Sequence, residues 1–340
     1  MNDRDPEALL EPILALHQSI RDAVLESCAT QEAEALARVA GDAGGDTTYA
    51  IDAVAGDLLV RGLAVAAVQS PLCLIAEGIK DAILVLPRGA KETDCKWRVI
   101  IDPIDGTRGL MYQKRSAWIL TGVAPNRGSA TRLSDIVLAV QTEIPLLKQH
   151  LSDQVWAIRG RGAEARRYNR LTGAHAPLVP RPSLATTIEH GFAGLVRFFP
   201  GARDVLGAVD DEIAREVLGA PPPGRAATFE DQYMSTGGQL YELMAGHDRF
   251  IADLRPLVTG VLKSRGLPPG LCCHPYDICT ALIAQELGVQ LTGAHGEPLN
   301  APFDTTTDVA WAGYANADLR AAIEPALRLV LIRHHLGSTR

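Results

Sequence analysis

The chain has 340 residues, of which 47% are hydrophobic, and its 33 Lys and Arg against 40 Asp and Glu give a formal net charge of −7. This composition can build a full globular core, and the length predicts one large or two medium domains. Nucleic acids and anionic membranes are bound by clustered Lys and Arg, so we expect neither as a partner. A small phosphorylated molecule remains a possible ligand.

Nothing in the sequence predicts export or membrane insertion. No apolar stretch reaches the roughly 18 residues that a membrane span needs. The first residues are acidic and lack the basic and then apolar layout of a secretory signal. The six cysteines follow neither a CxxC motif nor the spacing of a disulfide framework, which is typical of reduced thiols. We therefore expect a cytoplasmic protein.

The first predicted element is an amphipathic helix, because apolar residues recur with helical spacing over positions 9–24. The polar, glycine-rich stretch 41–48 predicts a flexible loop, and a second helix is expected over 51–68. Two apolar runs, 72–76 and 97–101, then predict buried strands. An acidic residue, Glu77 or Asp102, directly follows each run.

Strands and helices alternate in the rest of the chain, which predicts a layered α/β fold. We expect an N-terminal half, 1–175, that carries the metal and phosphate motifs, and a C-terminal half, 176–340, that completes the metal site and the substrate cleft. The further elements that the pattern predicts are strands at 117–123, 135–140, 154–158 and 250–254, helices at 210–218 and 238–246, an irregular region over 180–228, and a helix from Pro275 to about Gly288.

The strongest local signal is the hexapeptide Asp102–Thr107, which follows a predicted buried strand. Asp102 and Asp105 could simply form turns and cap helices, as Asp often does. That interpretation must also explain Glu77, at the end of another strand, and Asp277, in the first turn of a predicted helix. Four carboxylates at such positions would repel one another unless a cation lay between them, and hard oxygen ligands favour Mg²⁺ over zinc.

These motifs resemble those of the inositol monophosphatase superfamily of Mg²⁺-dependent, lithium-sensitive phosphatases. The likeness runs from about residue 8 to about residue 320 and implies an αβαβα five-layer sandwich of the inositol monophosphatase and sugar phosphatase type, and a homodimer. Segments 45–52 and 253–256 are closer to the archaeal branch, which acts on both inositol phosphate and fructose bisphosphate. The motifs that carry the resemblance are Trp97–Thr107, Ala76–Gly78, Pro275–Cys279, Gly45–Asp52 and Asp253–Pro256.

The resemblance also implies a metal site with two or three Mg²⁺ ions. Glu77, Asp102 and the backbone carbonyl of Ile104 would hold one ion. Asp102, Asp105 and Asp277 would hold a second, with Asp102 bridging the two.

Phosphate binding and water activation are implied for the same region. Asp105, Gly106 and Thr107, at the start of a helix, would bind the phosphate. Asp46 paired with the Thr107 hydroxyl would, together with Glu77, orient and deprotonate the attacking water. The alternative for Asp46 is a loop residue that forms an Asx turn.

The substrate contacts are less specific. Asp253 and Arg255 would contact substrate hydroxyls or a second anionic group, although a structural ion pair explains them equally well. Arg108 and Thr236 are further candidates, with a solvent-facing stem and a plain helix start as their alternatives. The chain departs from the family by an insert over 257–274.

The sequence thus predicts a Mg²⁺-dependent phosphomonoesterase that releases phosphate from a small sugar or polyol phosphate, of the inositol monophosphate or fructose bisphosphate kind. One alternative is a phosphatase of a nucleotide or of a bulkier phosphorylated biosynthetic intermediate. An alternative of another class is a non-catalytic protein that binds a sugar phosphate. The water-activating residues favour an enzyme, because a binding protein would not need them.

Overall fold

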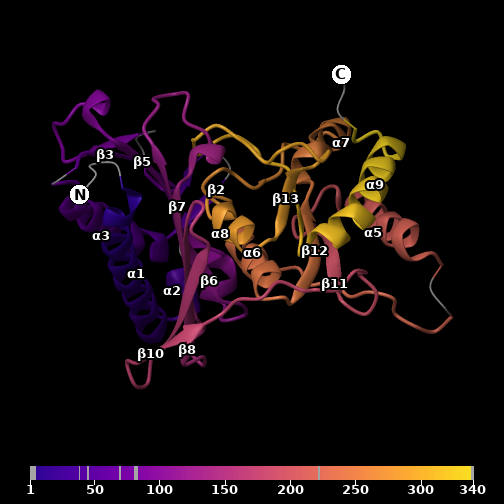
Figure 1. The fold of residues 1–340 in the computed structure, drawn as a ribbon, viewed down its shortest axis with the longest axis horizontal. Helices are drawn as coiled ribbons and strands as arrows, with labels where there is room; N and C mark the ends of the chain where they lie inside the picture. The colour runs from indigo at the N-terminus through magenta and orange to yellow at the C-terminus, as the bar shows by residue number, and fades with distance from the viewer. Residues whose placement is uncertain are drawn as a thin grey trace.

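The structure is a computed structural model that describes residues 5–337, apart from positions 38, 44–45, 69, 80–82 and 221–222. The side chains at positions 33, 39–43, 46–48, 50, 53 and 66 are also outside the described part. Five layers cross the molecule in the order helices, sheet, helices, sheet, helices (Figure 1). The predicted αβαβα sandwich is therefore confirmed.

The first layer consists of two long helices. A short 3₁₀ turn over Pro6–Leu9 leads into α1 (Leu10–Thr30), and α3 (Ala50–Ala67) packs beside it. Both helices were predicted from the sequence. Their buried apolar faces cover the central sheet. The short helix α2 (Ala33–Leu36) follows α1. None of the described helices combines the length and apolar character that a membrane span needs.

The segment between these helices is a hairpin, so the prediction of a loop over 41–48 was wrong. Strands β1 (Val39–Ala43) and β2 (Asp46–Tyr49) pair in antiparallel fashion. Such a pair is held by backbone hydrogen bonds, which a polar and glycine-rich sequence can make as well as an apolar one. Composition therefore gave no signal for it.

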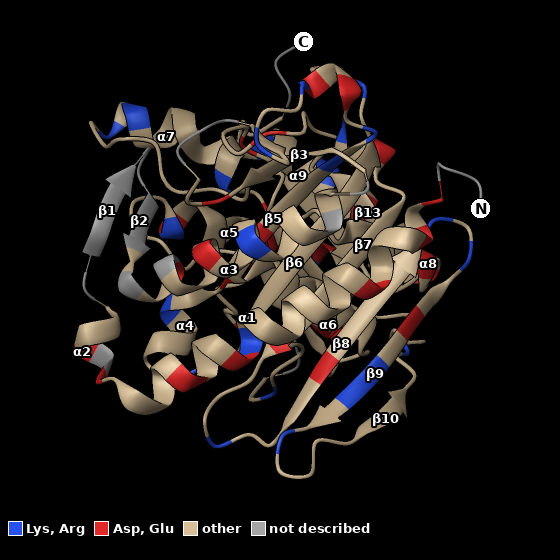
Figure 2. Ribbon diagram, turned by 90° about the vertical axis from the view of Figure 1, so that its left-hand side faces the viewer, with Lys and Arg blue, Asp and Glu red and all other residues tan. Residues whose placement is uncertain are grey.

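The central sheet has eight strands in the order β10-β9-β8-β7-β6-β5-β3-β4. Among the described neighbouring pairs in this sheet, β3 and β5 run parallel and the others run antiparallel. At one end of the sheet lie β8, β9 and β10, and basic and acidic positions are interspersed along the ribbon on this side of the molecule (Figure 2). The strands are β3 (Leu72–Ala76), β4 (Leu84–Leu86), β5 (Trp97–Asp105), β6 (Ala117–Pro125), β7 (Leu138–Ile144), β8 (Leu151–Ile158), β9 (Ala163–Asn169) and β10 (His175–Leu178).

The middle layer consists of α6 (Thr236–Met244) and α8 (Ala281–Glu286), which pack between the two sheets. The predicted helix from Pro275 was too long, because positions 275–280 form successive turns and α8 begins only at Ala281. These turns lie against β6 at Gly122, where an added Cβ would lie 3.0 Å from the carbonyl oxygen of Cys279. Tight contact with the sheet thus replaces the first turn of the expected helix.

The second sheet has four strands in the order β11-β12-β14-β13, and α5 (Arg203–Leu218) and α9 (Ala317–Arg333) cover its outer face (Figure 1). The predictions of a helix at 210–218 and a strand at 250–254 are confirmed with different bounds. Among the strands, sequence reasoning missed β4, β9, β10, β11, β13 and β14, and among the long helices it missed α9. The strands are β11 (Phe192–Leu195), β12 (Asp248–Asp253), β13 (Gln290–Gly293) and β14 (Trp311–Tyr314).

A buried histidine joins α1 to the central sheet. The ring nitrogens Nδ1 and Nε2 of His17 lie 2.9 and 2.7 Å from the hydroxyl oxygens of Thr142 and Thr121. Burial lowers the pKa of His17 to about 3, so the ring is neutral at pH 7. One nitrogen then donates a hydrogen bond and the other accepts one, which matches two hydroxyl partners.

This histidine predicts how stability depends on pH. As the pH falls below 6.5 the unfolded chain binds a proton at His17, whereas the folded protein does not bind it until about pH 3. The free energy of unfolding should therefore fall by up to about 1.4 kcal/mol per pH unit in this window. His17→Gln keeps a donor and an acceptor but cannot titrate. Urea denaturation near pH 7 and pH 5 should show a loss of about 2 kcal/mol in the wild type that the variant lacks; equal losses would contradict the assignment.

Candidate functional site

Four acidic residues from distant parts of the chain line one cavity at the edge of the central sheet. Glu77 directly follows β3, and Asp102 and Asp105 lie within β5. Asp277 comes from the turns before α8. The structure thus brings together the four carboxylates that the sequence singled out.

A bulge in β5 explains why two of them face the same way. Asp102 pairs with Leu120 of β6, but Asp105 pairs with Trp118, so two residues of β5 oppose one residue of β6. Side chains alternate along a regular strand, and residues three apart would point to opposite faces. The extra residue at the bulge therefore places the side chains of Asp102 and Asp105 on the same face of the sheet. Pro103 suits this position because it has no backbone N–H to leave unpaired.

The carboxylates are close and buried. Oxygen atoms of Asp102, Asp105 and Asp277 all lie within 4.8 Å of one another. Asp102 is 2% exposed and Asp105 is 7% exposed. Burial, followed by the charges of Asp105 and Asp277, raises the pKa of Asp102 well above its ordinary value. Burial likewise raises the pKa of Asp105 to about 6. A cation at the centre of the three would relieve this repulsion.

Hydrogen bonds from the middle layer fix Asp105. The hydroxyl of Ser235 and the backbone N–H of Gly237 donate to its Oδ2 at 2.9 and 2.6 Å. Ser235 is also the N-cap of α6, where its hydroxyl oxygen accepts the N–H of Gly238 at 2.8 Å. One serine therefore orients both the helix and the carboxylate.

Local donors also orient the other carboxylates. The N–H of Ile104 donates to Oδ1 of Asp102 at 2.9 Å, and Glu77 lines the same cavity. Oδ2 of Asp277 accepts the N–H of His274 at 2.6 Å, which closes the turn before α8. The orientations are thus set by the chain around each residue.

The hydroxyl of Thr107 has a different acidic partner from the one that the sequence suggested. It donates to the carbonyl of Ile104 at 2.7 Å and to Oδ1 of Asp52 at 3.1 Å. Asp46, the expected partner, begins β2, but its side chain lies outside the described residues. Since a hydroxyl has one hydrogen, its two acceptors occupy its donor capacity. The Ile104 carbonyl, predicted as a metal ligand, has a second lone pair for that purpose.

Asp52 was present in the quoted segment 45–52 but was not recognised. It lies in the first turn of α3, where its Oδ2 accepts the N–H of Tyr49 at 2.7 Å. It also lines the cavity. Its place six residues after Asp46, at a helix start, was the signal that could have identified it.

Phosphate binding was expected at Asp105, Gly106 and Thr107, where α4 (Thr107–Met111) begins. All three residues line the cavity. Gly106 has a positive φ of 95°, and an added Cβ would lie 3.0 Å from the Cβ of Ser235. Glycine is therefore required there on two grounds, and the chain can turn from β5 into α4 beside the carboxylates.

Asp253 and Arg255 form a structural ion pair next to the cavity. Nε of Arg255 donates to Oδ1 and Oδ2 of Asp253 at 2.8 and 3.0 Å, and Nη1 donates to the carbonyl of Leu271 at 2.9 Å. Asp253 has no exposed surface, which corrects the expectation of a direct substrate contact. Only Arg255 of this pair is in the cavity wall. Asp253 can influence a substrate through the guanidinium that it holds.

The remaining wall is aromatic and cationic. Arg108 lies 5.5 Å from the ring centre of Tyr49 and 6.0 Å from that of Phe199. Arg255 lies 4.8 Å from the ring centre of Phe198. Thr236, the other candidate substrate contact, is buried at the start of α6 and also lines the cavity. The two phenylalanines come from the irregular region, where no sequence pattern marked them.

Ser235→Ala should weaken both metal binding and stability. The variant loses the N-cap of α6, at a cost of about 1 kcal/mol. It also loses a donor to Asp105, which should reduce Mg²⁺ affinity about tenfold. Asn316→Ala is the matched control, because Asn316 caps α9 by accepting the N–H of Leu319 at 2.9 Å. Urea denaturation should show that both variants are destabilised, and calorimetric Mg²⁺ titration should show weaker binding in Ser235→Ala alone. Equal affinities would contradict the role of Ser235.

Solved structures share this fold at low sequence identity. No protein-family model matches the chain, and no curated protein matches its sequence. The fructose-1,6-bisphosphatase of Leishmania major aligns with a TM-score of 0.68 at 13% identity, over 96% of this chain and 95% of its own. The extragenic suppressor protein suhB of Bartonella henselae aligns with a TM-score of 0.64 at 16% identity, over 94% and 98%. The Thermotoga maritima IMPase aligns with a TM-score of 0.61 at 16% identity, over 96% and 98%.

These alignments span nearly the whole of each chain. The chain therefore shares the fold of these three proteins, and the resemblance drawn from the motifs is confirmed at the level of the fold. The likeness to the archaeal branch stays a prediction.

Proposed function

We propose that this protein is a Mg²⁺-dependent phosphomonoesterase that acts on a small sugar or polyol phosphate. The observation that carries the proposal is the convergence of Asp102, Asp105 and Asp277 to within 4.8 Å, beside the hydrogen-bonded pair of Thr107 and Asp52. A cation site and a polar pair that can handle a water then lie in one cavity. Two of the proteins that share the fold are named as a fructose-1,6-bisphosphatase and an IMPase, which supports the same reaction class.

The donor set suits Mg²⁺. The three clustered ligands are carboxylates, which are hard oxygen donors, and their mutual repulsion in the buried site is the term that a divalent cation removes. Glu77 and the Ile104 carbonyl would complete the coordination of two or three ions. When bound, Mg²⁺ would lower the pKa of water and neutralise charge on the phosphate.

The chain's own residues would orient the water and accept its proton. The hydroxyl hydrogen of Thr107 faces the Ile104 carbonyl and Asp52, so the hydroxyl oxygen can accept a hydrogen bond from a water in the cavity. A proton from the water can then pass through Thr107 Oγ1 to Asp52 Oδ1. Glu77, which lines the same cavity, would be a second base. In this proposal Asp52 takes the role that the sequence predicted for Asp46, whose side chain lies outside the described residues.

The phosphate would be held by backbone N–H groups at the start of α4. The first N–H groups of a helix lack partners within it, and those of Gly106 and Thr107 belong to this set. Because α4 has five residues, its dipole contributes less than the individual hydrogen bonds. Arg108 and Arg255 supply positive charge at the same cavity.

Asp102→Asn should abolish phosphate release, because it removes the carboxylate at the centre of the cluster. The fold should survive, since Asn has the same shape and relieves the repulsion. Thermal unfolding in EDTA should show no loss of stability, and adding Mg²⁺ should stabilise the wild type but not the variant. Phosphate release from inositol 1-phosphate and fructose 1,6-bisphosphate should stop in EDTA and return with Mg²⁺ in the wild type.

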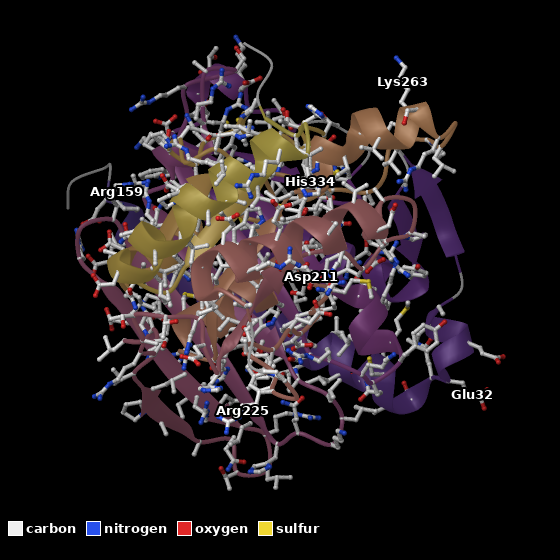
Figure 3. All side chains as sticks on the ribbon, turned by 90° about the vertical axis from the view of Figure 1, so that its right-hand side faces the viewer. Glu32, Arg159, Asp211, Arg225, Lys263 and His334 are labelled. Atoms are coloured by element: carbon white, nitrogen blue, oxygen red, sulfur yellow. The ribbon has the colours of Figure 1, made fainter. Side chains whose placement is uncertain are left out.

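The control for this variant is Asp211→Asn. Asp211 lies on α5, on the opposite side of the molecule from the N-terminal helices (Figure 3). The turnover of the Asp211→Asn variant should equal that of the wild type. Undiminished release by Asp102→Asn, or release that resists EDTA, would refute the metal assignment. Inhibition by Li⁺ is a further expectation from the resemblance.

A comparison of Asp52→Asn with Asp46→Asn should decide between the two candidate bases. If Asp52 accepts the proton through Thr107, Asp52→Asn should lower kcat by about a hundredfold or more. Its Mg²⁺ affinity should stay unchanged, and Asn still offers an oxygen to Tyr49. Asp46→Asn should retain its kcat. Steady-state kinetics on the same substrates measures both, and the reverse order of effects would restore Asp46.

A nucleotide or a bulkier intermediate is the second candidate substrate. The rings of Phe198 and Phe199 in the cavity wall favour it, because a planar base can stack on a phenyl ring. Including adenosine monophosphate in the phosphate-release assay distinguishes the two. A kcat/KM higher on this nucleotide than on both sugar phosphates would select the nucleotide.

A further inference from the structure

The insert over 257–274 lies beside the cavity although it contributes none of the clustered carboxylates. It contains the end of a 3₁₀ turn (Arg255–Val258) and the helix α7 (Thr259–Ser264). In Figure 3 the labelled Lys263 of this helix projects away from the body of the molecule. The opposite side of the insert contacts two segments that build the cavity wall.

The first contact is with the end of the segment that joins β11 to α5 and with the first turn of α5. Nη1 and Nη2 of Arg265 donate to Oδ1 and Oδ2 of Asp204 at 2.8 and 2.7 Å, and Nη1 also donates to the carbonyl of Gly201 at 2.7 Å. The buried Leu262 packs against the same glycine, where an added Cβ would lie 2.6 Å from its Cδ2. The insert therefore fixes positions directly after Phe198 and Phe199.

The second contact is with Arg255. The carbonyl of Leu271 accepts its Nη1 at 2.9 Å, and Leu271 and Cys272 themselves line the cavity. The Arg255 guanidinium lies 4.8 and 5.3 Å from the ring centres of Phe198 and Phe199. Both ends of the insert thus support one unit, formed by the two rings and the guanidinium.

This unit has the chemistry to hold the body of a cyclic sugar or cyclitol. Phenyl rings pack against the C–H face of such a ring. A guanidinium has five N–H donors, and the hydrogen bonds to Asp253 and Leu271 use those on Nε, Nη2 and Nη1 once each. The second N–H on each Nη is then available for hydroxyl oxygens.

We propose that the insert is a substrate-positioning element, which holds Phe198, Phe199 and Arg255 against the non-reacting ring of a cyclic sugar or cyclitol phosphate. The inference rests on the proposed function. Arg265 is a positioning residue in this scheme, because it acts through the segment that carries the two rings. Its loss should affect substrates with a ring and spare those without one.

Arg265→Ala tests the proposal by comparing inositol 1-phosphate and fructose 1,6-bisphosphate with glycerol 2-phosphate, which has no ring. KM for the cyclic substrates should rise about fivefold. This factor corresponds to the upper value of the free energy that an exposed ion pair contributes. Their kcat, the KM for glycerol 2-phosphate and the Mg²⁺ affinity should stay unchanged. Asp204→Ala should raise the same KM values by no more than Arg265→Ala, because Arg265 then keeps its hydrogen bond to Gly201, and the double variant should be no worse than Arg265→Ala.

Two control variants separate this role from a general one. Arg333 joins α9 to α5 at Glu212, with an N···O distance of 2.7 Å and a side chain 45% exposed, against 38% for Arg265. Arg333→Ala therefore breaks a comparable contact to the same helix, and Lys263→Ala changes the solvent side of the insert. Both should leave every KM unchanged.

The outcomes distinguish the inference from the function on which it rests. An unchanged KM for the cyclic substrates in Arg265→Ala, or an equal rise for glycerol 2-phosphate, overturns the inference while the phosphatase proposal stands. A wild type that hydrolyses glycerol 2-phosphate but neither cyclic substrate also overturns the inference alone. A wild type that releases phosphate from none of the three overturns both.

Discussion

Repulsion among buried carboxylates is the constraint on which this structure depends. Asp102, Asp105 and Asp277 come within 4.8 Å of one another, and the first two are almost fully buried. Each carboxylate accepts at least one hydrogen bond from a backbone N–H close to it. Such donors stabilise the charged form but do not cancel the mutual repulsion, so the arrangement is complementary to a cation.

The layered architecture is what brings these donors to one point. The bulge in β5 turns Asp102 and Asp105 to the face that the middle layer covers. That layer supplies Ser235 and Gly237 at the start of α6, and the turns before α8 supply Asp277. α3 brings Asp52 to Thr107 from the other side of the sheet. The site therefore needs three layers, and none of them could form it alone.

Sequence reasoning correctly predicted those parts of the molecule in which a residue pattern is compatible with only one local structure. The apolar runs at 72–76 and 97–101 are strands, and the Asp102–Thr107 motif lies where they end. Sequence reasoning was wrong where backbone geometry determines the local structure, as in the paired strands before α3 and the turns over 275–280. Asp52 was overlooked for a related reason. It shares one short segment with Asp46, and its contact with Thr107 follows only from its place at the start of α3. The role of Asp46 stays a prediction, because its side chain lies outside the described residues.

The cavity has two sides with different origins. Its carboxylate side is built from β3, β5 and the turns before α8, where the motifs can be read along the chain. Its other side is built from Phe198, Phe199 and Arg255, which depend on an irregular connection and on the insert over 257–274. A motif can specify ligands within a few residues, but ring positions set by contacts some 60 residues apart, such as Arg265 with Asp204, have no local pattern. The reaction class can therefore be inferred from the sequence, whereas the residues that we propose to recognise the substrate's ring come together only in the folded chain.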